Sequence, residues 1–167
     1  MNAIRLLLGA AALATATHSI AAEARVEVRF SDPEKFSDLR TSSLSTERER
    51  AALTDELRRH LEREAPQRLP AGMRLAITIT DVDMAGEFRP VGRAPMPDLR
   101  VVKEHDAPRV DLDFRLLRAD GTVEREGHRE LRDTQFLART GPGRADLLRF
   151  EKALLDRWLE REFATPR

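Results

Sequence analysis

The sequence contains no cysteine, and this absence excludes several kinds of chemistry. Disulfide bonds, thiolate metal sites and thiol nucleophiles all require a cysteine side chain. A bacterial lipid anchor is attached to a cysteine too, so we expect no lipid anchor. The fold must therefore be stabilised by packing and polar contacts alone.

The sequence also has few aromatic residues and no net charge. There is no tyrosine, and Trp158 is the only tryptophan. Glycan-binding surfaces usually expose several aromatic rings, and we expect Trp158 in the core instead. The 29 Lys and Arg residues balance 29 Asp and Glu residues, which gives a formal net charge of +0. A nucleic-acid partner would favour a basic surplus, so we expect no nucleic-acid binding.

Long apolar runs are confined to the N-terminus. Arg5 precedes an uncharged run over residues 6–16, and small residues follow at 19–22. The run is shorter than the about 20 residues that a membrane span needs. This pattern is typical of a cleavable secretory signal peptide. We expect a signal peptide over residues 1–21, cleavage after Ala21 or Ala22, a periplasmic protein without a membrane span, and a single domain over 22–167.

Hydrophobic periodicity predicts the remaining elements. Alternating residues predict strands, and leucines spaced four apart predict an amphipathic helix that begins at a capping box of Thr46 and Glu49. The expected elements are a strand at 25–30, a helix from Thr46 to Pro66, strands at 74–82 and 99–102, a hairpin at 109–131 and a helix from Arg144 or Ala145 to Phe163. This order predicts an α+β fold of two layers: one mixed four- or five-stranded sheet with both helices on one face.

The hairpin at 109–131 is the clearest element, because its alternation ends at a turn that contains Gly121. Its register stays open from the sequence. One register sets Asp111 opposite Arg129, and another sets Phe114 over Gly127.

The second hairpin strand, 122–131, has few large apolar residues and is predicted to be an edge strand. Glu124, Glu126, His128 and Glu130 share one of its faces. These charges could hold a cation, but they are more typical of a solvent face that blocks edge-to-edge pairing. Pairing of two copies through this edge is one route to a homo-oligomer.

The segment 86–98 is rich in glycine and proline and is predicted to be a long loop. Asp81 and Asp83 lie just before it, at the end of a strand. Long loops often carry function, so we expect ligand or partner binding here. The candidate binding residues are Asp81, Asp83, Glu87, Phe88, Arg89 and Arg93.

Catalytic signatures are missing from the sequence. It has no Gly-x-Ser-x-Gly motif and no His-Glu-x-x-His motif. We therefore expect no cofactor, no metal site and no catalytic residues, and predict a non-catalytic periplasmic binding or assembly module for an envelope protein or small ligand. The alternative is a metal-dependent or hydrolytic enzyme that uses Asp81, Asp83 and His105.

Five sets of short motifs resemble a known family. They lie at 30–38, at 85–90, at 100–103 with 107–110, at 120–121 with Gly127, 129–133 and Phe136, and at 151–155 with Trp158 and 162–163. Together they resemble a family of secreted proteobacterial proteins catalogued only as a domain of unknown function. The resemblance implies export to a Gram-negative envelope and supplies no activity.

Overall fold

The computed structural model describes residues 25–42, 44–89, 99–140 and 146–163. The elements in chain order are β1 (Val26–Phe30), η1 (Pro33–Lys35), α1 (Glu47–Glu64), η2 (Ala65–Gln67), β2 (Arg74–Asp83), β3 (Glu87–Arg89), β4 (Leu99–Val101), β5 (Arg109–Leu117), β6 (Val123–Arg132), α2 (Phe136–Thr140) and α3 (Arg149–Phe163). The predicted signal peptide lies outside these residues and stays a prediction. No helix in the described ranges has the length and apolar character needed to cross a membrane.

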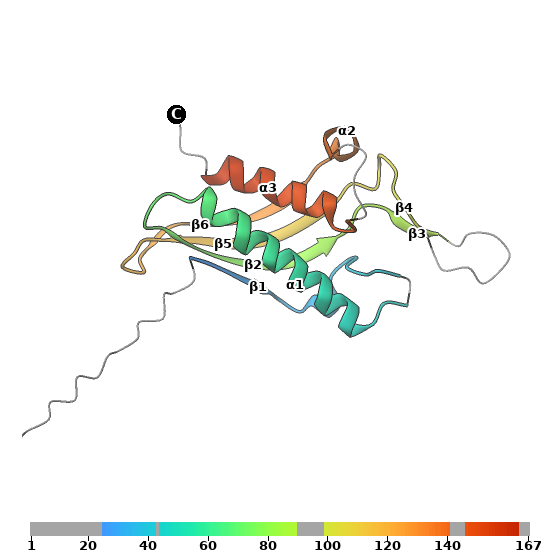
Figure 1. The fold of residues 1–167 in the computed structure, drawn as a ribbon, viewed down its shortest axis with the longest axis horizontal. Coiled ribbons are helices and arrows are strands. Elements are labelled where there is room, and N and C mark those ends of the chain that lie inside the picture. Colours follow the sequence, from blue (N-terminus) through green and yellow to red (C-terminus); the bar gives the residue numbers. More distant parts are fainter. Residues whose placement is uncertain (1–24, 43, 90–98, 141–145, 164–167) are drawn as a thin grey trace, which may run out of the picture.

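Four strands form one mixed sheet in the order β1-β2-β5-β6. β1 runs parallel to β2, whereas β5 is antiparallel to both β2 and β6. The helices α1 and α3 lie side by side over one face of this sheet (Figure 1). The predicted two-layer α+β fold is therefore confirmed. β3 and β4 form a separate two-stranded sheet at one end.

The first helix begins where the capping box predicts. The backbone N–H of Glu49 donates to the Thr46 hydroxyl at 3.3 Å, and the Thr46 N–H donates to the Glu49 carboxylate at 2.7 Å. Leu53, Leu57 and Leu61 then point into the core at four-residue spacing.

The second long helix begins later than predicted. Residues 147–148 form a turn, and α3 starts at Arg149. The Asp146 carboxylate accepts a hydrogen bond from the Leu148 N–H at 2.9 Å, which favours a turn before the helix. The short helix α2 was not predicted, because its length leaves no room for a helical repeat of apolar residues.

The core is centred on three aromatic rings. Phe114 of β5 packs edge-on against Trp158 and Phe163 of α3, with ring centroids 5.8 and 5.7 Å apart. Trp158 is buried, as predicted. The Arg129 guanidinium lies 4.9 Å from the centroid of the Phe114 ring on the β6 side. This cluster joins the sheet to α3.

The structure resolves the hairpin register. Phe114 lies opposite Gly127, and Asp111 lies opposite Glu130 rather than Arg129. Gly127 leaves room on the helix-facing side, and the Arg129 side chain occupies it beside the Phe114 ring. β6 is an edge strand, as predicted.

Replacing Phe114 with alanine should lower the free energy of unfolding by about 3–5 kcal/mol, because it opens a cavity between β5 and α3. Urea denaturation followed by circular dichroism measures the change. Val123→Ala is the control: Val123 is 45% exposed, so its loss should stay within about 0.5 kcal/mol. Equal losses in both variants would contradict the placement of the core.

Candidate functional site

The candidate residues gather at the end of the main sheet where β3 and β4 begin. Asp81 and Asp83 are the last outward-facing residues of β2. Glu87, Phe88 and Arg89 form β3, so the predicted loop 86–98 is wrong at its start. These three residues pair with Leu99–Val101, and this pairing overrides the loop-like composition around them. Arg93 lies outside the described residues.

Gly86 makes the turn from β2 into β3. Its φ is +87°, a conformation that side chains with a Cβ rarely adopt. A Cβ at this position would lie 2.7 Å from the Val101 carbonyl oxygen. Glycine is therefore needed here both for the backbone conformation and for the close approach of β4.

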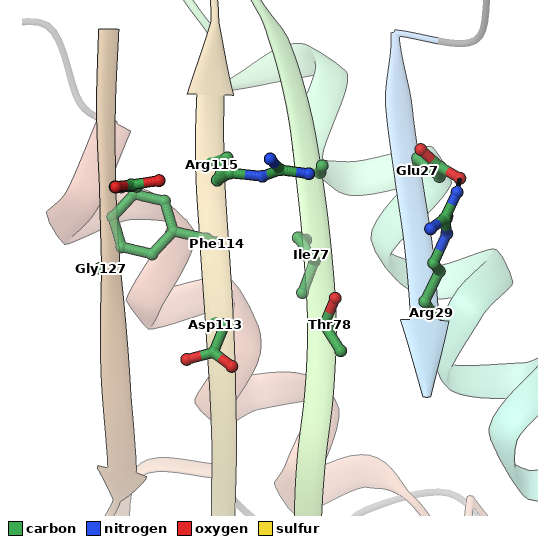
Figure 2. A pocket seen from close by; sticks show the side chains of 10 residues that line it. Glu27, Arg29, Ile77, Thr78, Asp113, Phe114, Arg115 and Gly127 are labelled. Atoms are coloured by element: carbon green, nitrogen blue, oxygen red, sulfur yellow. Dashed lines mark hydrogen bonds and ion pairs between the residues drawn. The ribbon is translucent and has the colours of Figure 1, made fainter. Parts of the chain in front are cut away.

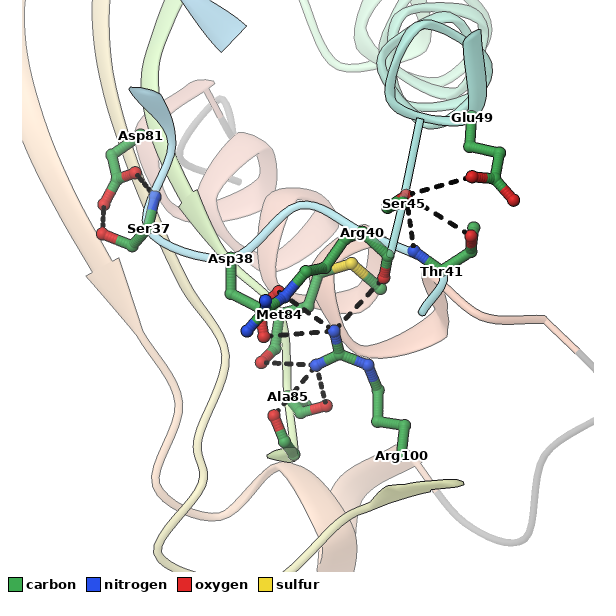
Figure 3. Close-up of polar contacts among 11 residues, drawn as sticks. Ser37, Asp38, Arg40, Thr41, Ser45, Glu49, Asp81, Met84, Ala85 and Arg100 are labelled. Carbon is green, nitrogen blue, oxygen red and sulfur yellow. Dashed lines mark hydrogen bonds and ion pairs between the residues drawn. The ribbon is translucent and has the colours of Figure 1, made fainter. Parts of the chain in front are cut away.

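The Arg100 guanidinium fastens the base of this hairpin. Its Nη1 donates to the carbonyl oxygens of Met84, Ala85 and Gly86 at 3.4, 3.3 and 2.9 Å (Figure 3). The Arg100 side chain is only 8% exposed. One cation from β4 thus binds the segment that leads into β3.

The second terminal nitrogen of Arg100 contacts the segment that contains Asp38 and Arg40. Nη2 donates to both carboxylate oxygens of Asp38 at 3.1 Å and to the Arg40 carbonyl at 3.2 Å. Asp38 also joins the edge of β2, because its N–H donates to the Val82 carbonyl at 2.9 Å. A buried arginine is stable only when paired, and Asp38 supplies the opposite charge.

Phe88 belongs to the same anchored unit. Its ring lies under two guanidinium groups, those of Arg100 at 4.3 Å and Arg40 at 5.4 Å from the ring centroid. These cation–π contacts hold the middle of β3 against the loop before α1. In this position Phe88 helps to position the hairpin, while Glu87 and Arg89 on either side of it are exposed.

Asp81 is saturated by partners from two segments. It accepts hydrogen bonds from the Ser37 N–H at 2.6 Å, the Ser37 hydroxyl at 2.7 Å and Arg109 Nη2 at 3.0 Å. Burial opposes ionisation of this carboxyl, but these hydrogen bonds hold its pKa below the ordinary value. Asp83 has fewer partners: burial raises its pKa, and Arg109 lies 4.0 Å away.

A polar pocket of about 220 Å³ lies beside Asp83. Its lining residues are Asp83, Met84, Gly86, Glu87, His105, Asp106, Ala107, Arg109 and Arg132. Asp83 and His105, named together in the enzyme alternative, therefore share a pocket, and Asp81 contacts it only through Arg109. The described residues include no group of three His, Asp or Glu side chains that could hold a metal ion. Mixed charges of this kind suit the binding of a polar group.

Glu151 is a buried carboxyl that sequence reasoning missed. It is fully buried on α3, and its Oε1 accepts a hydrogen bond from the Ala85 N–H at 2.8 Å. Burial raises its pKa from 4.5 to about 7, against the effect of this hydrogen bond. Its position in the sequence could have indicated burial, because Glu151 interrupts the apolar stripe of the helix between Leu148 and Leu154.

Replacing Arg100 with lysine should loosen the hairpin, because one ammonium cannot bind the carbonyls and the Asp38 carboxylate together. We expect a loss of about 1–3 kcal/mol in the free energy of unfolding. Hydrogen exchange should also become faster at 84–89 and 99–101. The control is Arg89→Lys, an exposed change on the same hairpin. Matching exchange in the two variants would rule out the anchoring role of Arg100.

Glu151 should make stability depend on pH. A carboxyl whose pKa is raised by folding favours the native state below its unfolded pKa, and this contribution is lost as the pH rises from 4.5 to about 7. The loss amounts to about 3 kcal/mol. Glu151→Gln, which does not titrate, should lack this component. Urea titrations across this pH range measure the free energy of unfolding. If this free energy depends on pH in the same way in wild type and variant, the role of Glu151 is refuted.

Comparison with known proteins identifies one relationship. No curated protein and no solved structure matches the chain. The profile of one family matches residues 24–161, which covers nearly all of the described fold and every described element of the candidate site. The chain therefore belongs to the family described as "Protein of unknown function (DUF3016)".

Proposed function

We propose that this chain is a non-catalytic binding or assembly module that docks a partner protein through the β3–β4 hairpin. The observation that carries the proposal is the anchoring of this hairpin by Arg100. The guanidinium ties β4 to the carbonyls that lead into β3 and to Asp38. A hairpin fixed at its base loses less conformational freedom on binding, which favours affinity.

The exposed side chains of the hairpin suit a protein partner. Leu99 of β4 is 58% exposed, although it is a large apolar residue. Glu87 and Arg89 of β3 are exposed near it, and the β3–β4 register sets Arg89 opposite Leu99. An apolar contact with charged groups at its rim is the usual composition of a protein–protein interface.

The motifs that carry the family resemblance also meet at this place. Stretches 30–38, 85–90 and 100–103 contribute Asp38, Gly86 and Arg100 to the same set of contacts. The stretch 107–110 adds Arg109, which binds Asp81. This convergence supports a shared role for the corner rather than for the helical layer.

The proposal includes export to the periplasm, where an envelope protein would be the partner. The support is the pattern of residues 1–22: one arginine, a short apolar run and small residues at the cleavage position. Packing and polar contacts stabilise the fold without cysteine, so folding there would not depend on disulfide formation.

The enzyme alternative has weaker support. Asp81, its first proposed residue, is held by Ser37 and Arg109, and a carboxylate with three donors is a poor base. Asp83 and His105 do line one pocket, which suits recognition of a polar group equally well. The geometry therefore favours binding over catalysis.

A photo-crosslinking amino acid at Leu99 should form an adduct with the partner in cells that express the full chain. The same amino acid at Arg59, which is exposed on α1, serves as the control and should give none. Immunoblots of the irradiated cells, followed by mass spectrometry of the adduct, give the readout. Equal adducts at Arg59 and Leu99, or none at either Leu99 or Arg89, would contradict docking through the hairpin.

A further inference from the structure

We propose that the polar pocket beside Asp83 binds a free α-amino acid, with its ammonium group toward Asp106 and its carboxylate toward Arg132. The proposal does not depend on docking through the β3–β4 hairpin, although Glu87 of β3 lines the pocket. The observation that carries it is the presence of unpartnered groups of both charge signs in one small pocket.

The ends of three strands form one wall of this pocket. Asp83 of β2 lies opposite Arg109 of β5, and Arg109 lies opposite Arg132 of β6. Two cations that lie directly opposite each other destabilise strand pairing. Asp81 binds Arg109 at 3.0 Å, but Arg132 has no ion-pair partner in the described part of the chain. This end of the sheet therefore favours an additional anionic group beside Arg132.

Asp106 supplies the opposite charge from a buried position. Its side chain is only 7% exposed, and its Oδ1 lies 3.3 Å from His105 Nε2. The histidine balances the carboxylate charge only when it is protonated. Oδ2 of Asp106 is buried and has no hydrogen-bond partner. A buried acceptor without a donor costs free energy, so the site favours a ligand group that donates an N–H.

Main-chain contacts hold Asp106 in place. The Gly86 N–H donates to the Asp106 carbonyl at 3.1 Å, and the Asp106 N–H donates to the Lys103 carbonyl at 3.0 Å. The first contact joins the segment around Asp106 to the turn between β2 and β3. The pocket is therefore formed without a ligand, which favours affinity because little ordering is needed on binding.

A ligand with charge of one sign fits this pocket poorly. A bare anion would lie beside Asp83 and Asp106, whereas a bare cation would lie beside Arg109 and Arg132. A zwitterion can bring an ammonium group to the acids and a carboxylate to the arginines. Complementary charges at both ends then fix its orientation.

The size and lining of the pocket limit the ligand further. Its volume of about 220 Å³ is below the about 300–1,000 Å³ that is typical of sites for drug-sized ligands. No phenylalanine or tryptophan lines it, so stacking on a nucleobase or a sugar ring is not supported. Glu87, the third acid of the lining, is already paired with Arg89 at 3.3 Å. A free α-amino acid carries both charges on few atoms and suits this volume.

A larger groove on the open face of the sheet lacks these features (Figure 2). Its volume is about 370 Å³, and residues of β1, β2, β5 and β6 line it. Glu27 and Arg29 in its lining bind each other at 2.8 Å, and Arg115 lies opposite Glu126. Its described lining residues include no buried polar atom that lacks a partner. The pocket beside Asp83 is therefore the stronger candidate for a small ligand.

The test screens the standard α-amino acids against the full chain by thermal shift and measures the affinity of each ligand found by calorimetry. At least one amino acid should raise the melting temperature, because a ligand that binds only the folded state stabilises it. Its N-acetyl derivative lacks the ammonium group and its primary amide lacks the carboxylate. Each derivative should bind about tenfold to a hundredfold more weakly. Hydrogen exchange should show protection by the ligand at 83–87 and 105–109.

Two variants test the two ends of the ligand separately. Asp106→Asn keeps the size of the side chain and removes its charge, and Arg132→Gln removes the cation. Each should weaken binding about tenfold, and Asp106→Asn should also reduce the preference for the free amino acid over its N-acetyl derivative. Glu104→Gln and Arg115→Gln are the matched controls and should leave the affinity unchanged, because both side chains are exposed and lie outside the pocket. Circular dichroism checks the fold of every variant.

Four results would overturn the proposal. They are a screen in which no amino acid raises the melting temperature, derivatives that bind as tightly as the parent, unchanged affinity in both pocket variants, and an equal loss of affinity in the control variants. The first two results need only the wild-type chain, so they hold even if a variant fails to fold.

Discussion

The position of the β3–β4 hairpin depends on one buried cation. The Arg100 guanidinium binds carbonyls from residues 84–86 and the Asp38 carboxylate, which belong to segments far apart in the sequence. Burying a charge is costly unless geometry and pairing are good, and here both terminal nitrogens of the planar group find acceptors, although the buried Nε has none. The neighbouring residues Leu39 and Met84 belong to the main apolar core. The candidate site therefore takes its shape from these polar contacts together with the edge of the core.

Two kinds of interaction therefore stabilise different parts of the described fold. The body of the sheet is held to α1 and α3 by buried apolar side chains, including the aromatic cluster around Phe114. The corner beside it is held by ionised or titratable groups: Asp38 with Arg100, Asp81 with Arg109, and Glu151 with the Ala85 amide. Changes in pH and salt act on such groups far more than on apolar packing. The corner can thus respond to conditions that leave the body folded.

The sequence predicts the parts of this fold whose information is local. The alternation of apolar and polar residues predicts β2 and β5, and the capping box at Thr46 predicts the start of α1. The structure confirms all three elements. The hairpin register was not predictable, since two registers satisfied the same pattern. The contact of Arg100 with Asp38 joins residues 62 positions apart and follows no periodicity, so neither position indicated its partner. β3 has only three residues beside glycine and proline, and its pairing with β4 determines its conformation.

A net charge of zero does not show on which face of a strand each charge lies. Along β6 acidic and basic residues alternate, so the segment reads as neutral and solvated. A strand, however, sends alternate side chains to opposite faces. Glu124, Glu126 and Glu130 thus lie on the open face with Arg132, while Arg125 and Arg129 lie on the helical side and bind Glu162. Arg118 pairs with Glu124 on the open face. Net charge argues against a polyanionic partner, but the strand period is what determines which charges a neighbour would meet.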